Sequence, residues 1–130
     1  MLRILISTIT MLILDGLWLG FIAKKLYLQE IGSLLRMSPK GGMDPLWLPA
    51  LIVYVALIAG VLLFAIPKAQ GSALNALIWG AIFGLICYAV YDFTNLAVLA
   101  NWSWKMSIID TLWGMVLCGL TSFLTVLIAK

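Results

Sequence analysis

The sequence predicts an all-α polytopic membrane protein: four transmembrane helices in an antiparallel bundle, forming one domain over residues 1–130. Composition is the first reason, because 65% of the residues are hydrophobic and 10% are charged, whereas a soluble domain carries about 25% charged residues. Length is the second reason, because four apolar stretches each reach the roughly 20 residues that a spanning helix needs. None of them alternates with a two-residue period, which argues against the strands of a membrane barrel.

The four spans are expected at about residues 2–23, 46–66, 73–99 and 106–129. Lys24 and Lys25 stop the first span, and Pro67 follows the second. The connections at 67–72 and 101–105 are short, so the spans that they join should be antiparallel neighbours. The start of the first span resembles a signal peptide, but no small-residue cleavage site follows it, so we expect a retained helix.

A short amphipathic interfacial helix is expected between the first and second spans, within residues 24–43. Apolar residues recur there at helical spacing, while the charged residues fall mostly elsewhere on the helical wheel. The apolar set consists of Leu26, Tyr27, Ile31, Leu34 and Leu35. Pro39, Gly41 and Gly42 should then break this helix before the second span begins.

Small residues inside the spans predict helix packing. Glycine or alanine residues four apart let two helices approach closely. Three such pairs occur, namely Gly16 and Gly20, Ala56 and Gly60, and Gly80 and Gly84. The cysteines, Cys87 and Cys118, lie inside apolar segments and are expected to be small buried hydrophobes.

The charged residues indicate an orientation. The formal net charge is +3, and no basic run occurs, so the cations are typical of membrane-end anchors rather than of a nucleic-acid-binding surface. With four spans, the larger group of cations on one side consists of Lys24, Lys25, Arg36, Lys40 and Lys105. The positive-inside rule places this group in the cytoplasm, so both termini are expected outside.

Four aspartates, one in or at the end of each span, are predicted to lie in the same half of the membrane. Asp15 and Asp92 lie well inside their spans, where an ionised Asp costs about 2.5–3.5 kcal/mol on insertion scales, so both should face the bundle interior. Asp110 lies about one turn into the fourth span. Asp44 precedes the second span and is expected to cap it.

Three of the aspartates occur in the pattern Asp-x-Leu-Trp, at residues 15–18, 44–47 and 110–113. On a helix, an Asp and a Trp three residues apart share a face, and an indole N–H can donate to a carboxylate. The third span instead carries tyrosine, threonine and asparagine around its aspartate. The candidate pocket residues are therefore Asp15, Trp18, Tyr88, Tyr91, Asp92, Thr94, Asn95, Asp110 and Trp113.

Three segments of the chain resemble the signature segments of the DUF2177 family. They are Leu-Asp-Gly-Leu-Trp-Leu-Gly at 14–20, Tyr-Asp-Phe-Thr-Asn-Leu-Ala at 91–97 and Asp-Thr-Leu-Trp-Gly at 110–114. The resemblance covers nearly the whole chain, and Tyr-Asp-x-Thr-Asn is its most specific part. It implies a four-helix protein of the bacterial inner membrane, and it implies no mechanism. The residues on motif positions are Asp15, Trp18, Asp92, Thr94, Asn95, Asp110 and Trp113.

Three functions stay open at the level of the sequence. The acidic and aromatic pocket predicts a proton- or cation-coupled transporter of a small or amphipathic substrate, and a homodimer is expected because four short helices enclose little space. One alternative is a membrane-embedded enzyme acting on a lipid or isoprenoid, with its aspartates as acid and base. In that enzyme Asp15, Asp92 and Asp110 would be the acid and base, or together with Asn95 they would bind Mg²⁺; no other cofactor is evident. The other alternative is a non-catalytic lipid-binding or structural subunit.

Cofactors other than Mg²⁺ find little support in the composition. The chain has no histidine, which argues against haem, against the commoner zinc sites and against an imidazole general base. The apolar composition and the acidic pocket predict the partners: the lipid bilayer, and a lipid or a small amphipathic or cationic ligand, rather than nucleic acid.

Overall fold

The computed structural model describes residues 1–129, and its helices form four long stretches. All four are long and apolar enough to cross a membrane, at bounds close to those predicted from the sequence. The first is α1 (Leu2–Leu17) with the π-helical η1 (Trp18–Ile22), and the second is α3 (Trp47–Gly60) with the π-helical η3 (Val61–Ala65) and α4 (Ile66–Lys68). The third and fourth are α5 (Ala73–Val98) and α6 (Trp104–Ile128).

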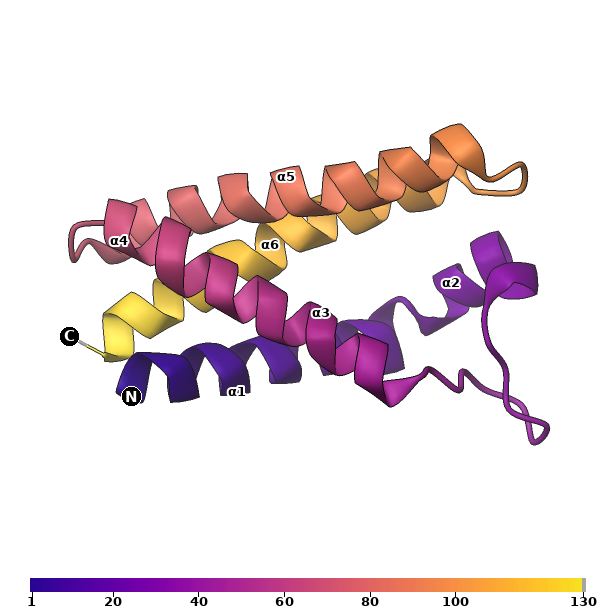
Figure 1. The fold of residues 1–130 in the computed structure, drawn as a ribbon, viewed down its shortest axis with the longest axis horizontal. Coiled ribbons are helices and arrows are strands. Elements are labelled where there is room, and N and C mark those ends of the chain that lie inside the picture. The colour runs from indigo at the N-terminus through magenta and orange to yellow at the C-terminus, as the bar shows by residue number, and fades with distance from the viewer. Residues whose placement is uncertain (130) are drawn as a thin grey trace.

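Successive stretches run in opposite directions, so both ends of the described chain lie at the same end of the bundle (Figure 1). A hydrogen bond of 2.9 Å between Ser7 Oγ and Thr125 Oγ1 joins α1 to α6 near that end. Helix α6 is central, because it contacts α1, α2, α5 and η3. The antiparallel four-helix arrangement predicted from the sequence is confirmed.

Helix α3 crosses the bundle obliquely. Its C-terminal end and α4 lie beside α5, whereas its N-terminal end lies near α1 (Figure 1). The buried side chains of this stretch, Ile58, Val61, Ala65 and Ile66, all belong to its C-terminal part. The N-terminal half of α3 therefore stands apart from α5, which leaves room between them at the end of the bundle away from the termini.

Helices α5 and α6 form the most extensive pair in the fold. A Cβ added to Gly84 would overlap the carbonyl oxygen of Gly114, and one added to Gly80 would overlap that of Cys118. The prediction that Gly80 and Gly84 let two helices approach closely is therefore confirmed. The same prediction for Gly16 and Gly20 is wrong, because a Cβ at either position would meet nothing within 4 Å.

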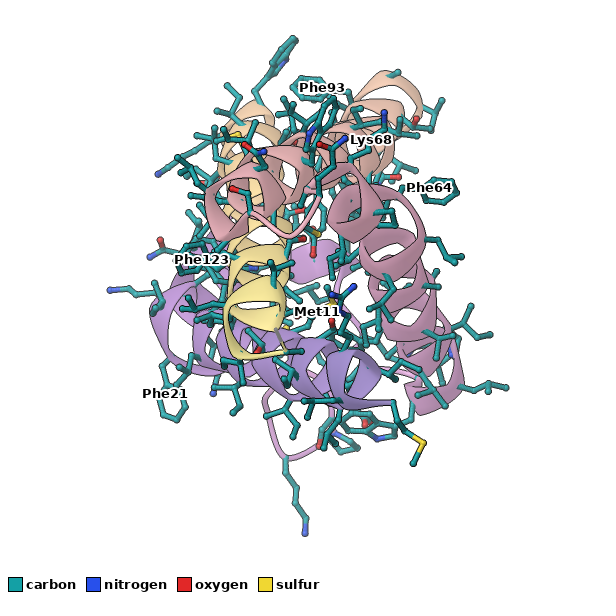
Figure 2. All side chains as sticks on the ribbon, turned by 90° about the vertical axis from the view of Figure 1, so that its left-hand side faces the viewer. Met11, Phe21, Phe64, Lys68, Phe93 and Phe123 are labelled. Carbon is teal, nitrogen blue, oxygen red and sulfur yellow. The ribbon has the colours of Figure 1, made fainter. Side chains whose placement is uncertain are left out.

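Large apolar side chains cover the outside of the bundle. Met11 points into the interior and is 0% exposed, whereas Phe21, Phe64 and Phe93 project outward (Figure 2). Such an exterior would be unfavourable in water, and it is the expected exterior of a protein whose solvent is lipid.

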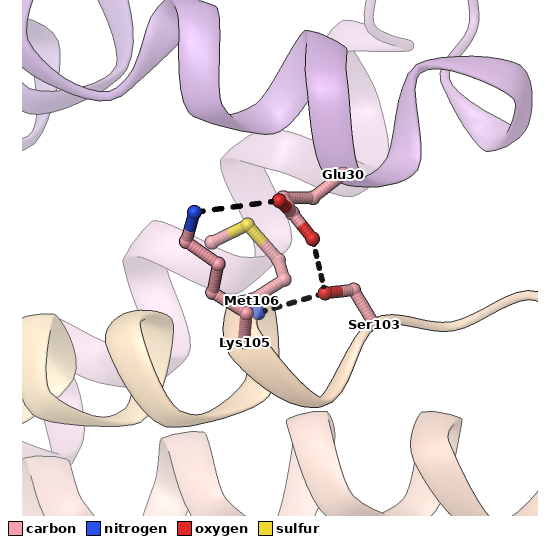
Figure 3. A network of polar contacts seen from close by, with 4 residues as sticks. All are labelled: Glu30, Ser103, Lys105 and Met106. Atoms are coloured by element: carbon pink, nitrogen blue, oxygen red, sulfur yellow. Dashed lines mark hydrogen bonds and ion pairs between the residues drawn. The ribbon is translucent and has the colours of Figure 1, made fainter.

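The predicted interfacial helix is present as α2 (Lys24–Ile31), followed by the 3₁₀-helical η2 (Gly32–Leu34). It is held against the start of α6 by Glu30. Ser103 Oγ donates to Glu30 Oε2 at 2.6 Å, and Lys105 Nζ lies 3.6 Å from Glu30 Oε1 (Figure 3). Ser103 Oγ also accepts from the backbone N–H of Met106 at 3.1 Å, so Glu30 joins α2 to the residue that caps α6.

The expected role of Asp44 as a helix cap is wrong. Helix α3 begins at Trp47 after Leu46 and has no side-chain cap. Asp44 instead belongs to a turn between α2 and α3, where its backbone N–H donates to the Arg36 carbonyl oxygen at 2.8 Å. Asp44 lies two residues before Leu46, which occupies the N-cap position of α3, so it is not placed where a side chain caps the helix.

Candidate functional site

A cavity of about 430 Å³ lies inside the bundle, toward the end that carries α2. It takes residues from α1, η1, α2, α3, α5 and α6, so it depends on the whole fold. Its polar lining consists of Asp15, Tyr27, Cys87, Tyr88, Tyr91 and Asp110, and its apolar lining of Leu19, Val53 and Leu57. The volume falls within the range of about 300–1,000 Å³ that is typical of small-molecule sites.

Asp15 joins three helices at the base of this cavity. It is 7% exposed. Tyr54 of α3 donates its hydroxyl to Asp15 Oδ2 at 2.5 Å, and Trp113 of α6 donates its Nε1–H to Asp15 Oδ1 at 2.9 Å. Each carboxylate oxygen therefore has a donor from a different helix, which is how a buried carboxylate is kept in an apolar interior.

Trp18 and Trp113 stack face to face beside Asp15, with ring centroids 4.5 Å apart and an interplanar angle of 5°. Trp18 is the first residue of η1, and Trp113 lies in α6. The shared Asp–Trp spacing led us to expect indole donation to a carboxylate, and the structure shows this for Trp113 alone. The donation crosses between helices, because Trp113 reaches Asp15 of α1 rather than Asp110 of its own motif.

Tyr27 of α2 connects the stacked indoles to Asp110. Trp18 Nε1 donates to the Tyr27 hydroxyl at 3.4 Å, and that hydroxyl donates to Asp110 Oδ1. Burial, followed by the Asp110 carboxylate beside it, raises the pKa of the Tyr27 hydroxyl above its ordinary value. The hydroxyl therefore stays protonated at neutral pH and acts as a donor to Asp110.

Asp92 is fully buried between α5 and α6 and lies outside the cavity lining. Its Oδ2 accepts from Thr111 Oγ1 at 3.3 Å, while no donor within residues 1–129 reaches its Oδ1. Asp110, which precedes Thr111 in α6, is also buried and lies close enough for its charge to act on Asp92. Two ionised carboxylates close together in an apolar interior repel one another, so a proton held by one of the pair is favourable.

The remaining candidates from the third span divide between two faces of α5. Tyr88 packs against Gly114 and lines the cavity, and Tyr91 lines its outer part. Asn95 is half-buried and does not line the cavity. Thr94 is exposed and is separated from the cavity, although it is part of the most specific motif.

Sequence reasoning missed two tyrosines and misjudged a cysteine. Tyr27 was expected only as an apolar position of an interfacial helix, and Tyr54 stands among Val, Leu and Ile without a polar neighbour in the sequence. Since each donates to an aspartate on another helix, only the packing reveals them. Cys118 is fully buried as expected, but Cys87 is half-buried and lines the cavity.

The proposed Mg²⁺ ligands do not come together as one set. Asp15 accepts from Tyr54 and Trp113, while Asp92 and Asn95 lie outside the cavity that Asp15 and Asp110 line. Within residues 1–129 no three His, Cys, Asp or Glu side chains are grouped as they would be around a metal ion. What the arrangement offers instead is two carboxylates at the wall of an aromatic cavity, with a third carboxyl group behind them.

The fold and the site together define the class of protein: a polytopic integral membrane protein with buried acidic side chains between its helices. The chain belongs to the family described as "Predicted membrane protein (DUF2177)", whose model matches residues 1–127. The match covers all four stretches and therefore confirms the resemblance that was noted from the sequence motifs. No match was found among curated proteins or among solved structures.

Proposed function

We propose that this protein is a small transporter that binds amphipathic organic cations in its cavity and exchanges them for a proton. The observation that carries the proposal is the lining of the cavity, in which Asp15 and Asp110 face the same space as three tyrosines. Both carboxylates are less than a tenth exposed, so a cation that reaches them meets little competition from water.

The chemistry of the lining favours an organic cation over a bare metal ion. Carboxylates supply charge attraction, and the faces of tyrosine rings attract quaternary ammonium groups. Leu19, Val53 and Leu57 add an apolar wall that a hydrated metal ion would not use. A ligand with a positive head and an apolar body satisfies both kinds of surface.

The proton exchange is proposed from the Asp92–Asp110 pair. A cationic head near Asp110 stabilises the ionised form of the pair and so favours release of the proton that one of the two carboxyl groups holds. Conversely, a proton on the pair removes part of the negative charge that attracts the ligand. The two occupants therefore exclude one another, which is the requirement for exchange at a single site.

The orientation is part of this proposal. Four of the five cations assigned to one side belong to α2 or to the turn that follows it, and Lys105 lies in the first turn of α6. These segments lie at the end of the bundle that carries the cavity (Figure 1). By the positive-inside rule, we propose that this end faces the cytoplasm and that the cavity opens in the cytoplasmic half of a bacterial inner membrane.

Cys87 provides a direct test of ligand binding, because it lines the cavity while Cys118 is fully buried. In protein reconstituted into nanodiscs, we expect hexyltrimethylammonium to slow the alkylation of Cys87 by N-ethylmaleimide. The uncharged analogue with a tert-butyl head of the same shape should give no protection. Asp15→Asn and Asp110→Asn should each weaken the protection at least tenfold in ligand concentration, because each removes a charge from the cavity.

Cys118 is the internal control for folding, since it becomes reactive only if the bundle opens. Asp44→Asn is the matched control for charge, because Asp44 lies in the turn between α2 and α3. Equal protection by the charged and the uncharged compound would overturn the proposal. Full protection in the Asp15→Asn/Asp110→Asn double variant, with Cys118 still unreactive, would also overturn it.

A further inference from the structure

We infer that a second, apolar groove between α1 and α3 holds the alkyl chain of the same cation, whose head occupies the carboxylate cavity. The inference rests on the proposed function and names its substrate class as a single-chain cationic amphiphile. The groove has a volume of about 330 Å³. Ile4, Thr8 and Leu12 of α1 form one side, and Leu51 and Val55 of α3 with Leu62 of η3 form the other.

The groove and the cavity follow one another along the same face of α1. Ile4, Thr8, Leu12 and Asp15 of α1 are spaced four, four and three residues apart, so they form one continuous stripe on the helix, and Leu19 of η1 follows it. The first three line the groove, and the last two line the cavity. The alkyl chain of a ligand whose head lies at Asp15 can therefore extend along α1 into the groove.

Tyr54 stands at the junction of the two spaces. It lines the groove, and its hydroxyl donates to Oδ2 of Asp15, which lines the cavity. A cationic head at Asp15 competes with this hydroxyl for the same oxygen. Binding of the head would therefore break the hydrogen bond between Tyr54 and Asp15. The Tyr54 side chain could then move aside and let the alkyl chain pass from the cavity into the groove.

The dimensions and exposure of the groove fit an alkyl chain. The helix rises 1.5 Å per residue, so Ile4 and Asp15 are about 16 Å apart along α1, a reach on the order of a dozen methylene groups. Leu12 and Val55 are 46% and 59% exposed, so the groove is open sideways to lipid. A lipid chain from the bulk membrane can also lie there, but only a ligand with a positive head is held by Asp15.

Photolabelling tests where the chain lies. The probe is dodecyltrimethylammonium with a diazirine at its terminal carbon, added to the protein in nanodiscs and mapped by peptide mass spectrometry. Because the terminal carbon should reach the far end of the groove, we expect labels around Ile4 and Leu62, removed by excess unlabelled compound and reduced at least fivefold in Asp15→Asn. Ala59→Phe should reduce labelling similarly, because Ala59 lines the groove. Ala56→Phe is the matched control on α3, since Ala56 lines neither space and is exposed.

Two outcomes overturn the inference. One is labelling that spreads over all lipid-facing helix surfaces and is unchanged in Asp15→Asn, as a bulk lipid chain would give. The other is labelling that Ala59→Phe and Ala56→Phe affect equally. Protection of Cys87 by hexyltrimethylammonium, whose chain is too short to fill the groove, is measured in the same samples. If that protection persists while groove labelling fails, the chain subsite is wrong and the cation-binding proposal stands; if it is absent, both are wrong.

Discussion

Asp15 of α1 accepts hydrogen bonds from two other helices. A carboxyl group buried inside a bilayer is costly unless it is hydrogen-bonded, and the two donors to Asp15, Tyr54 of α3 and Trp113 of α6, offset that cost. The same two bonds fix α1 against both neighbours at the level of the cavity. Asp15 therefore has a structural role and a proposed ligand-binding role, and substitution of its donors separates the two.

We expect Trp113→Phe to destabilise the bundle by about 1 kcal/mol, because it removes the N–H donor from a buried carboxylate while keeping an aromatic ring against Trp18. Unfolding free energy in mixed micelles, measured by denaturing-detergent titration, gives the value. Tyr54→Phe should cost a similar amount, and the double variant more than the sum, because Asp15 then loses both donors.

Trp47→Phe is the control, since Trp47 is 77% exposed. A destabilisation by Trp113→Phe no larger than that of Trp47→Phe would mean that the indole N–H of Trp113 contributes nothing to the energy of the fold.

At the scale of helices, the bundle is a tight pair, α5 and α6, against which the other stretches pack less extensively. The tightness comes from Gly80 and Gly84, whose missing side chains let the backbones meet. The spacing of small residues in the sequence predicts close packing at Gly80 and Gly84, and it predicts the same at Gly16 and Gly20, which face open space. The spacing in the sequence shows that a helix has a stripe of small residues. Whether that stripe faces another helix depends on how the helix is rotated in the bundle.

The glycine contacts give a prediction at this scale. We expect Gly84→Ala to destabilise the bundle by about 1–3 kcal/mol, because the new Cβ would overlap the Gly114 carbonyl oxygen and force α5 and α6 apart. Gly16→Ala is the matched control, because it gains the same helix propensity of about 1 kcal/mol without a clash. The comparison uses unfolding free energies in the same micelles, and similar effects of the two variants would refute close packing at Gly84.

For the whole molecule, the sequence is sufficient to predict the four spans, the antiparallel order and the gathering of aspartates in one half of the bundle. Hydropathy and length decide these, because the bilayer leaves few alternatives to a spanning helix. The cavity itself was not predictable in detail. Its opening follows from the oblique path of α3, and its hydroxyl donors, Tyr27 and Tyr54, come from segments that carry no polar pattern.

The overall asymmetry of the molecule also follows from the packing. Polar groups concentrate in the cavity at the end that carries α2, whereas the groove toward the chain termini is lined by apolar residues, Thr8 and Tyr54. Asp92 lies behind the cavity in the α5–α6 interface, where its only donor in the described chain is Thr111. This position makes Asp92 the residue that tests proton exchange with the least effect on the shape of the cavity.

The most direct test of the central claim is the movement of protons in proteoliposomes loaded with a pH-sensitive dye. When hexyltrimethylammonium is added outside, we expect protons to leave the lumen as the cation enters, at a rate at least tenfold above that of empty liposomes. Asp92→Asn should bind the cation, as judged by protection of Cys87, but should no longer couple its entry to proton exit. Proton movement in wild-type protein equal to that in empty liposomes, while Cys87 is still protected, would show that the cavity binds cations without exchanging them and would contradict the proposed transport.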